Sequence, residues 1–270
     1  MAKKDALSVP NKGALLPKAK SGAETASADV NMSIAGHLVE VKARLTRVIL
    51  AFVAGIIAGS FVVEPIMSEL IRTGRGFSFI YIDPGELVGS YIKVVLIISL
   101  VLSAPVILYQ IWGFIRPALK ASEKRMGLFA LLGGTGFFIV GVLFAYLVAA
   151  PFTINFFVNF DTTGLVQAQI SIKSYIDFML TTMITFGLVF EMPMLTLFLS
   201  QLGIIKPKFL IKTRKYAILV IAVIAAILTP PDVVSQITIG VPMIVLYEIS
   251  ILVCRVIAKR KDLKKAAQAA

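Results

Sequence analysis

Long apolar runs separated by short charged segments make up most of the chain. Windows of about 20 apolar residues, the length that crosses a bilayer as a helix, fall at residues 45–63, 88–110, 126–150, 174–200, 216–229 and 236–257. Most charged residues lie between these runs, as expected where most of the chain must avoid ions. The pattern predicts an all-α membrane protein with six transmembrane helices. An even number of spans places both termini on the same side.

The fifth apolar run is too short for an ordinary crossing. It extends from Ala217 to Leu228, which as a helix covers about 18 Å where the hydrocarbon core needs about 30 Å. Pro230 and Pro231 end it sharply. The mismatch must be met by local thinning of the bilayer, by snorkelling or by burial among neighbouring helices. Thinning is our hypothesis.

The distribution of Lys and Arg predicts the orientation. The chain holds 27 such residues, and all but Arg72, Arg75, Lys93 and Lys173 lie before residue 48, in the segments 111–125 and 201–215, or from Arg255 onward. The positive-inside rule places these segments and both termini in the cytoplasm. Residues 1–31 read as a disordered extension, 32–257 as the six-helix membrane domain, and 258–270 as a basic cytoplasmic tail that attracts anionic lipid headgroups. No nucleic acid partner is implied.

Composition agrees with a membrane bundle, since 58% of the residues are hydrophobic and the mean hydropathy is +0.89. One cysteine and one histidine cannot form a Cys/His metal cluster. No GxSxG, HExxH or P-loop motif is present. We therefore expect no catalytic residues, no metal and no cofactor, and a protein that is not an enzyme. Cys254 should face lipid or be packed, and the Gly55/Gly59 pair should serve close helix packing within the chain.

Four charged residues lie in or at the edge of apolar runs, where they need partners or water. Glu191 has apolar sequence on both sides, and Pro193 should loosen the helix just beyond it. We interpret Glu191 as facing a polar groove, with a satisfied interhelical hydrogen bond as the alternative. For Glu248, a position facing the groove and a packing contact within the helix bundle are equally compatible with the sequence pattern. Lys93 and Asp177 lie near span ends, where snorkelling to the headgroups would suffice.

Two charged segments on the expected cytoplasmic face each contain a carboxylate beside apolar residues. Glu40 lies within 37–45, just before the first span, and Glu123 within 110–125, between the second and third. An i,i+4 pair of Glu40 with Arg44 and an i,i+3 pair of Glu123 with Lys120 would explain both without any binding role. Periodicity alone does not separate the two interpretations.

An ordered set of motifs between about His37 and Arg255 resembles the TatC family, a subunit of the twin-arginine protein translocase. The motifs are His37-Leu38 with Glu40, Pro105 through Phe114, Pro117, Glu123, Phe144-Ala145-Tyr146 with Pro151, Ser174-Tyr175-Ile176, Phe186-Gly187 with 190–193, Arg214-Lys215-Tyr216, 229–232 with Ser235-Gln236, and Leu246-Tyr247-Glu248. The resemblance implies a glove-shaped bundle in the cytoplasmic (inner) membrane whose short fifth and sixth helices do not fully span it. It also implies a receptor for signal peptides with paired arginines that exports folded proteins using the proton gradient.

The resemblance further implies roles for individual residues. Matched position by position, signal-peptide binding falls on Glu40, Glu123 and Phe114, with Trp112 and Pro117 shaping the loop. Two adjacent guanidinium groups ask for two carboxylates that accept forked hydrogen bonds, which Glu40 and Glu123 would supply. Further positions follow in the same way: Glu191 and Glu248 in an intramembrane groove, and Pro230, Asp232 and Gln236 in contact with TatA or TatB or in a structural role. TatA, TatB, membrane lipids and further copies of the chain are the implied partners.

One departure from the family pattern concerns the segment before the first span. Lys42 stands where the family usually has Arg, so a forked hydrogen bond there is in doubt, although Arg44 is near. Lys42, Arg44 and Lys93 are further site candidates.

The alternative from another functional class is a proton-coupled small-solute carrier with Glu191, Glu248 and Lys93 as a proton relay. A carrier should show two repeated halves. We find no convincing match between the spans before residue 150 and the spans after it. A passive scaffold is the third class.

Overall fold

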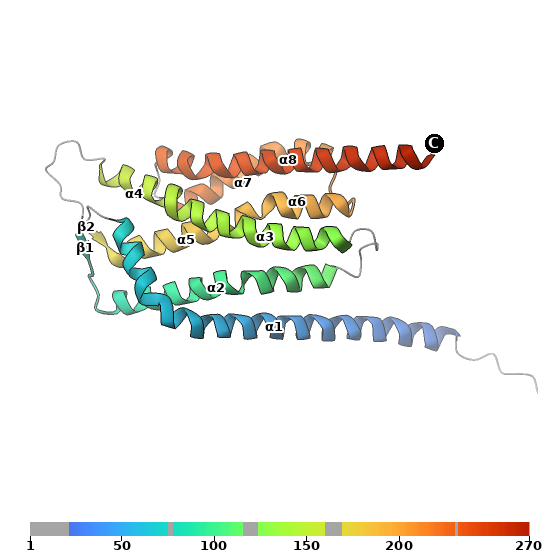
Figure 1. Ribbon diagram of the computed structural model, residues 1–270, viewed down its shortest axis with the longest axis horizontal. Helices are drawn as coiled ribbons and strands as arrows, with labels where there is room; N and C mark the ends of the chain where they lie inside the picture. The colour runs from blue at the N-terminus through green and yellow to red at the C-terminus, as the bar shows by residue number, and fades with distance from the viewer. Residues whose placement is uncertain (1–21, 75–77, 116–123, 160–168, 230–231, 270) are drawn as a thin grey trace, which may run out of the picture. The chain divides into compact units, whose positions relative to one another are not determined.

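The computed structural model describes residues 22–74, 78–115, 124–159, 169–229 and 232–269. The chain forms two compact units, residues 1–43 and 44–270, and each is described by itself. Each apolar run expected as a span corresponds to one or more helices (Figure 1). The helices are α1 (Gly22–Thr73), α2 (Gly85–Ile115), α3 (Lys124–Phe144), the π-helical turn η3 (Ala145–Ala149), α4 (Ala150–Val158), α5 (Ile172–Phe190), α6 (Met192–Gln201), α7 (Pro207–Leu228) and α8 (Val233–Ala269).

Five segments among the described residues are long and apolar enough to cross a membrane. They are Leu38–Thr73, Gly85–Phe114, Leu132–Val158, Ile172–Gln201 and Val233–Leu263. Helix α7 is not among them, in agreement with the short apolar run that we expected there. The expectation of a short sixth helix is wrong, because α8 continues without a break from Val233 past the end of its apolar part. Pro242 inside α8 does not interrupt it.

The helices also continue into both terminal segments. Helix α1 begins at Gly22, within the stretch 1–31 that we expected to be a disordered extension, and residues 1–21 lie outside the described part. Helix α8 extends the apolar span through the basic tail as far as Ala269. Residues 258–269 of the tail are therefore helical and continue the last span.

Prolines lie beside three irregular points in the helices: the break between α5 and α6, the π-helical turn before α4, and the bend of α1. Pro193 lies just after the break at Glu191 that separates α5 from α6, as the sequence predicted. Pro151 follows the π-helical turn η3, which relieves the clash and the missing hydrogen bond that proline causes in a regular helix. Helix α1 bends in its C-terminal part (Figure 1), and it contains Pro65.

Two short parallel strands, which the sequence analysis did not anticipate, join the segments after α1 and before α5. Strand β1 (Ser78–Ile80) pairs with β2 (Gln169–Ser171), with Phe79 opposite Ile170. The Phe79 and Tyr175 rings lie 4.8 Å apart, and the Tyr175 hydroxyl donates to the carbonyl of Leu70 at 2.7 Å. This end of unit 44–270 is called the strand end. The opposite end, where α2 finishes and α7 begins, is called the basic end.

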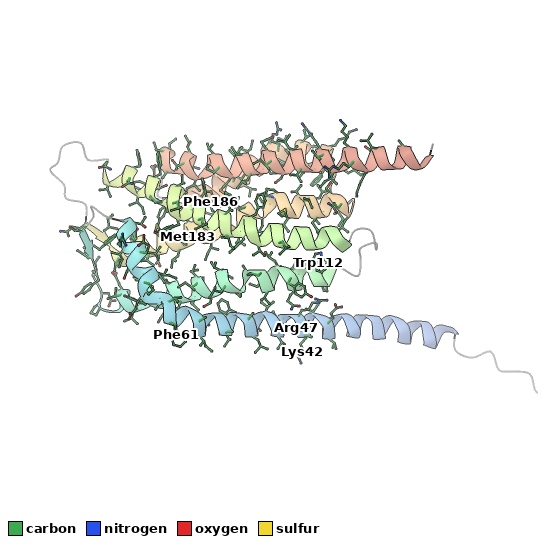
Figure 2. All side chains as sticks on the ribbon, in the orientation of Figure 1. Lys42, Arg47, Phe61, Trp112, Met183 and Phe186 are labelled. Atoms are coloured by element: carbon green, nitrogen blue, oxygen red, sulfur yellow. The ribbon has the colours of Figure 1, made fainter. Side chains whose placement is uncertain are left out.

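Helix α5 contacts both α2 and α3 and contributes buried residues to the two larger core clusters. Phe186 is fully buried and Met183 half-buried, whereas Phe61 of α1 points away from the helices and is 82% exposed (Figure 2). Cys254 is buried, so it is packed and does not face lipid. Cys254 lies against Ser200, with its Sγ 3.4 Å from the Ser200 Oγ.

Glycines set how closely the helices approach. A Cβ built on Gly55 would lie 3.0 Å from the backbone of Ser99 in α2, and one on Gly59 would lie 3.3 Å from the Val95 carbonyl oxygen. The Gly55/Gly59 pair therefore serves packing within the chain, as expected. Gly141 of α3 is the tightest of these contacts against backbone, because its Cβ would overlap the carbonyl oxygen of Phe186.

We predict that Gly141→Ala destabilises the bundle by about 1–3 kcal/mol, the usual cost of overpacking, because α3 and α5 must move apart. Gly136→Ala is the matched control, since a Cβ there meets nothing within 4 Å. The buried Cys254 provides the readout, through the temperature at which a thiol-reactive dye labels the purified protein. Equal midpoints for the two variants would contradict the packing role of Gly141.

Candidate functional site

At the basic end, Arg44 of α1 holds the C-terminal turn of α2. Its Nη2 donates to the carbonyl of Gly113 at 2.9 Å. Its Nη1 lies 3.5 Å from both the carbonyl oxygen and the side-chain Oε1 of Gln110. The last carbonyls of a helix have no intrahelical partner, and a cation there also interacts favourably with the helix dipole. Gly113 provides the space, because a Cβ on it would overlap Nη1 of Arg44.

An aromatic surface surrounds the turn that Arg44 holds. The rings of Tyr109 and Trp112 have centroids 6.3 Å apart, and Tyr109, Ile111 and Phe114 are all exposed large hydrophobic residues. Figure 2 shows Trp112 at this end of α2. The geometry therefore offers an apolar, partly aromatic patch immediately before the segment that contains Glu123.

The predicted signal-peptide residues are only partly within the described structure. Glu40 is partly exposed and Lys42 exposed; both lie on α1 in the unit 1–43 and both take part in interactions. Trp112 and Phe114 lie in the other unit, while Pro117 and Glu123 fall outside the described residues. The pairing of Glu40 with Glu123 thus stays a prediction.

Glu191 lies at the break between α5 and α6 and is buried, with 7% of its surface exposed. It faces α3, where a Cβ on Gly134 would lie 3.0 Å from its Oε2, and the neighbouring Gly133 leaves space for Met194. Among the described residues, Oε1 of Glu191 has no hydrogen-bond partner. The glycines of α3 therefore serve packing around a carboxylate that the bundle only partly satisfies. The intramembrane groove stays a prediction.

The other intramembrane charges form interhelical ion pairs. Arg214 of α7 and Glu248 of α8 are joined by a bond of 2.7 Å, so Glu248 makes the bundle contact that was one of its two interpretations. Lys93 of α2 pairs with Asp177 of α5 at 2.6 Å, so snorkelling is not needed to satisfy either residue. No described contact joins Glu191 to either pair, and the relay of a solute carrier gains no support.

Asp232 and Gln236 connect α7 to α8. The Asp232 carboxylate accepts hydrogen bonds from the backbone N–H of Ser235 at 2.7 Å and from its hydroxyl, as an N-cap of α8 does. The side-chain amide of Gln236 donates to the carbonyl of Ala222 at 3.0 Å. Both residues thus make contacts within the chain, whereas their contact with TatA or TatB stays a prediction, and Pro230 lies outside the described residues. In the described ranges, no group of three or more His, Cys, Asp and Glu could hold a metal ion.

Comparison with known proteins matches this arrangement to one family. The family model described as Sec-independent protein translocase protein (TatC) matches residues 36–242. This chain belongs to the TatC family. TatCy of Bacillus subtilis (strain 168) is 39% identical over 241 residues, which cover 87% of this chain and 93% of that protein. TatC of Aquifex aeolicus (strain VF5) is 35% identical over 241 residues, or 87% of this chain and 100% of that protein.

A solved structure supports the same family. The crystal structure of a twin arginine translocase receptor, TatC, has a TM-score of 0.75 at 35% identity and covers 82% of this chain and 99% of its own. As a TatC family member, this chain is an integral membrane component of a Sec-independent protein translocase. The motif resemblance was therefore correct.

Sequence reasoning missed two contacts that shape these sites. Arg44 reaches Gly113, 69 positions away, and Glu191 lies against Gly134 of another helix. No spacing rule connects positions so far apart. Only the residue types, a cation before a span and glycines within one, were visible in the sequence.

We predict that Arg44→Lys loosens the last turn of α2, because an ammonium cannot bond the two ends of the turn with a planar fork. Hydrogen exchange at residues 110–114 should accelerate about tenfold, which corresponds to about 1.4 kcal/mol. Arg47→Lys, an exposed arginine on the same helix, is the control. Unchanged protection in Arg44→Lys would show that its guanidinium does not hold the turn.

Proposed function

We propose that the chain is the receptor subunit that binds paired-arginine signal peptides, with Glu40 and Glu123 as the carboxylates that bind the two guanidinium groups. The observation that carries the proposal is the match to the TatC family over residues 36–242, which includes both carboxylates. Planar guanidinium groups form two parallel hydrogen bonds to a carboxylate, and such charge-assisted bonds are about twice as strong as neutral ones. Two separate carboxylates therefore select for two arginines.

The described end of α2 suits the part of a signal peptide that follows its arginines. Phe114, Ile111 and Tyr109 are exposed and would contact apolar residues of the peptide, while Trp112 and Pro117 shape the loop. Arg44 keeps this turn in place through Gly113 and Gln110. In this proposal Arg44 positions the site, and Lys42 adds a cation near Glu40 without a forked bond.

The proposal includes the assembly and its location. The chain crosses the inner membrane six times with both termini in the cytoplasm, since the Lys-rich and Arg-rich segments belong there. TatA, TatB and further copies of the chain are its partners, and the proton gradient drives the export of folded proteins. Glu191, buried at a helix break and incompletely satisfied, is the intramembrane carboxylate that later steps would use.

Replacing both arginines of a signal peptide by lysines should weaken binding to the purified chain about tenfold or more. Lysine keeps the charge but cannot form the planar fork, and tenfold corresponds to about 1.4 kcal/mol. Fluorescence anisotropy of labelled peptides measures this. A peptide with its arginines intact but scrambled apolar residues serves as a separate control for the aromatic patch. Equal affinity of the paired-arginine and paired-lysine peptides would refute the forked recognition.

Substituting Glu40→Gln together with Glu123→Gln should abolish export of a folded reporter that carries a paired-arginine signal, and should remove crosslinks between the signal and both positions. Glu64→Gln, an exposed carboxylate on α1 beyond its apolar part, should leave export unchanged. Normal export by the Glu40/Glu123 double variant would favour a passive scaffold instead.

A further inference from the structure

A groove between α2 and α5 has an ion pair on its wall and apolar side chains beside it. Nζ of Lys93 lies 2.6 Å and 2.7 Å from the two carboxylate oxygens of Asp177, and the two side chains remain 46% and 37% exposed. The groove has a volume of about 310 Å³, at the lower end of the range for sites that hold small molecules. Its other lining residues are Leu96, Ile97, Leu180, Thr181 and Ile184.

The pair lies within two candidate spans, near the strand-end termini of α2 and α5. Lys93 is eight residues after the start of α2 and Asp177 five after the start of α5, or about 12 Å and 8 Å along the two helices. Both helices belong to candidate spans of 30 residues. Charged groups that are half exposed at such a level need water, another protein group or a lipid headgroup. The two Lys–Asp bonds leave one N–H group of the ammonium and lone pairs of the carboxylate available.

The order of residues along the groove matches the polarity of a lipid. Both helices start at the strand end, so residues later in α2 and α5 lie deeper in the membrane. Leu96 and Ile97 follow Lys93 by one helical turn, and Leu180 and Ile184 follow Asp177 by one and two turns. The groove is therefore charged toward the headgroup region and apolar toward the middle of the bilayer.

We propose that this groove binds one phospholipid of the strand-end leaflet, with a zwitterionic headgroup that carries a primary amine. The lipid phosphate accepts a hydrogen bond from the remaining N–H of Lys93, and the lipid's ammonium group donates to Asp177. One acyl chain lies along Leu96, Leu180 and Ile184. An anionic headgroup would face repulsion from Asp177, and a quaternary ammonium could not donate a hydrogen bond, so the adjacent opposite charges select for a primary amine.

The test uses the full chain, purified and delipidated in detergent, and native mass spectrometry with added phosphatidylethanolamine, phosphatidylcholine or phosphatidylglycerol. We expect one phosphatidylethanolamine per chain, bound at least tenfold more tightly than the other two. The double variant Lys93→Met/Asp177→Leu removes the charges and keeps apolar volume, a replacement that often preserves stability. Thr181→Trp fills the groove and leaves the ion pair intact. Both should bind phosphatidylethanolamine at least tenfold more weakly.

The matched control is Glu69→Gln/Arg72→Gln, which removes an exposed ion pair of α1 near the strand end that does not line the groove. It should keep the wild-type affinity within twofold. Equal affinity for the three lipids, or unchanged binding in Thr181→Trp, would overturn the proposal. A water-filled groove would also overturn the proposal. In that case a polar maleimide would label the variant Thr181→Cys in a bilayer as fast as it labels Lys173→Cys, a variant at an exposed position. Absence of any retained lipid would indicate a different occupant and would also overturn it.

Discussion

Charged groups in or beside the apolar spans need partners, and the arrangement of the helices in unit 44–270 depends on which groups of the chain supply them. Lys93 with Asp177 joins α2 to α5, and Arg214 with Glu248 joins α7 to α8. Arg44 joins α1 to the end of α2, and Lys261 of α8 donates to the carbonyl of Ser200 at the end of α6. Each contact costs desolvation, which its partner must offset. Each therefore also determines which helices are neighbours.

Glu191 is the carboxylate that departs from this rule in the described part of the chain. Its Oε1 is buried without a hydrogen-bond partner, and it lies at the break between two helical segments rather than within one. A buried polar group without a partner carries a cost in free energy, and such a cost is often retained where a residue functions. The buried carboxylate oxygen without a partner thus belongs to Glu191, the residue that the sequence analysis singled out because apolar residues lie on both sides of it.

The sequence predicted helices well because a membrane helix needs only a long apolar run, and it predicted the break at Pro193 because proline removes a backbone donor. It did not predict β1 and β2, because three-residue strands carry no readable period. It also did not predict the partners of Lys93 or Arg44, because a run of apolar residues shows that a helix is buried in lipid but not which helix lies beside it. The proposed roles of Glu40 and Glu123 rest only on the family motifs, since helical spacing allowed local ion pairs equally well.

The contacts between α7 and α8 bear on how the short apolar run of α7 is accommodated. The Tyr247 hydroxyl donates to the carbonyl of Leu210 at 2.7 Å, Arg214 bonds Glu248, and Gln236 bonds Ala222 near the other end of α7. These contacts lie along most of α7 and hold it against α8. Most of its apolar residues after Ala217 remain exposed or half-buried, so burial among neighbours does not remove the mismatch. Because α7 is tied in this way, thinning of the adjacent bilayer or snorkelling of its cations is favoured over a change in α7 itself.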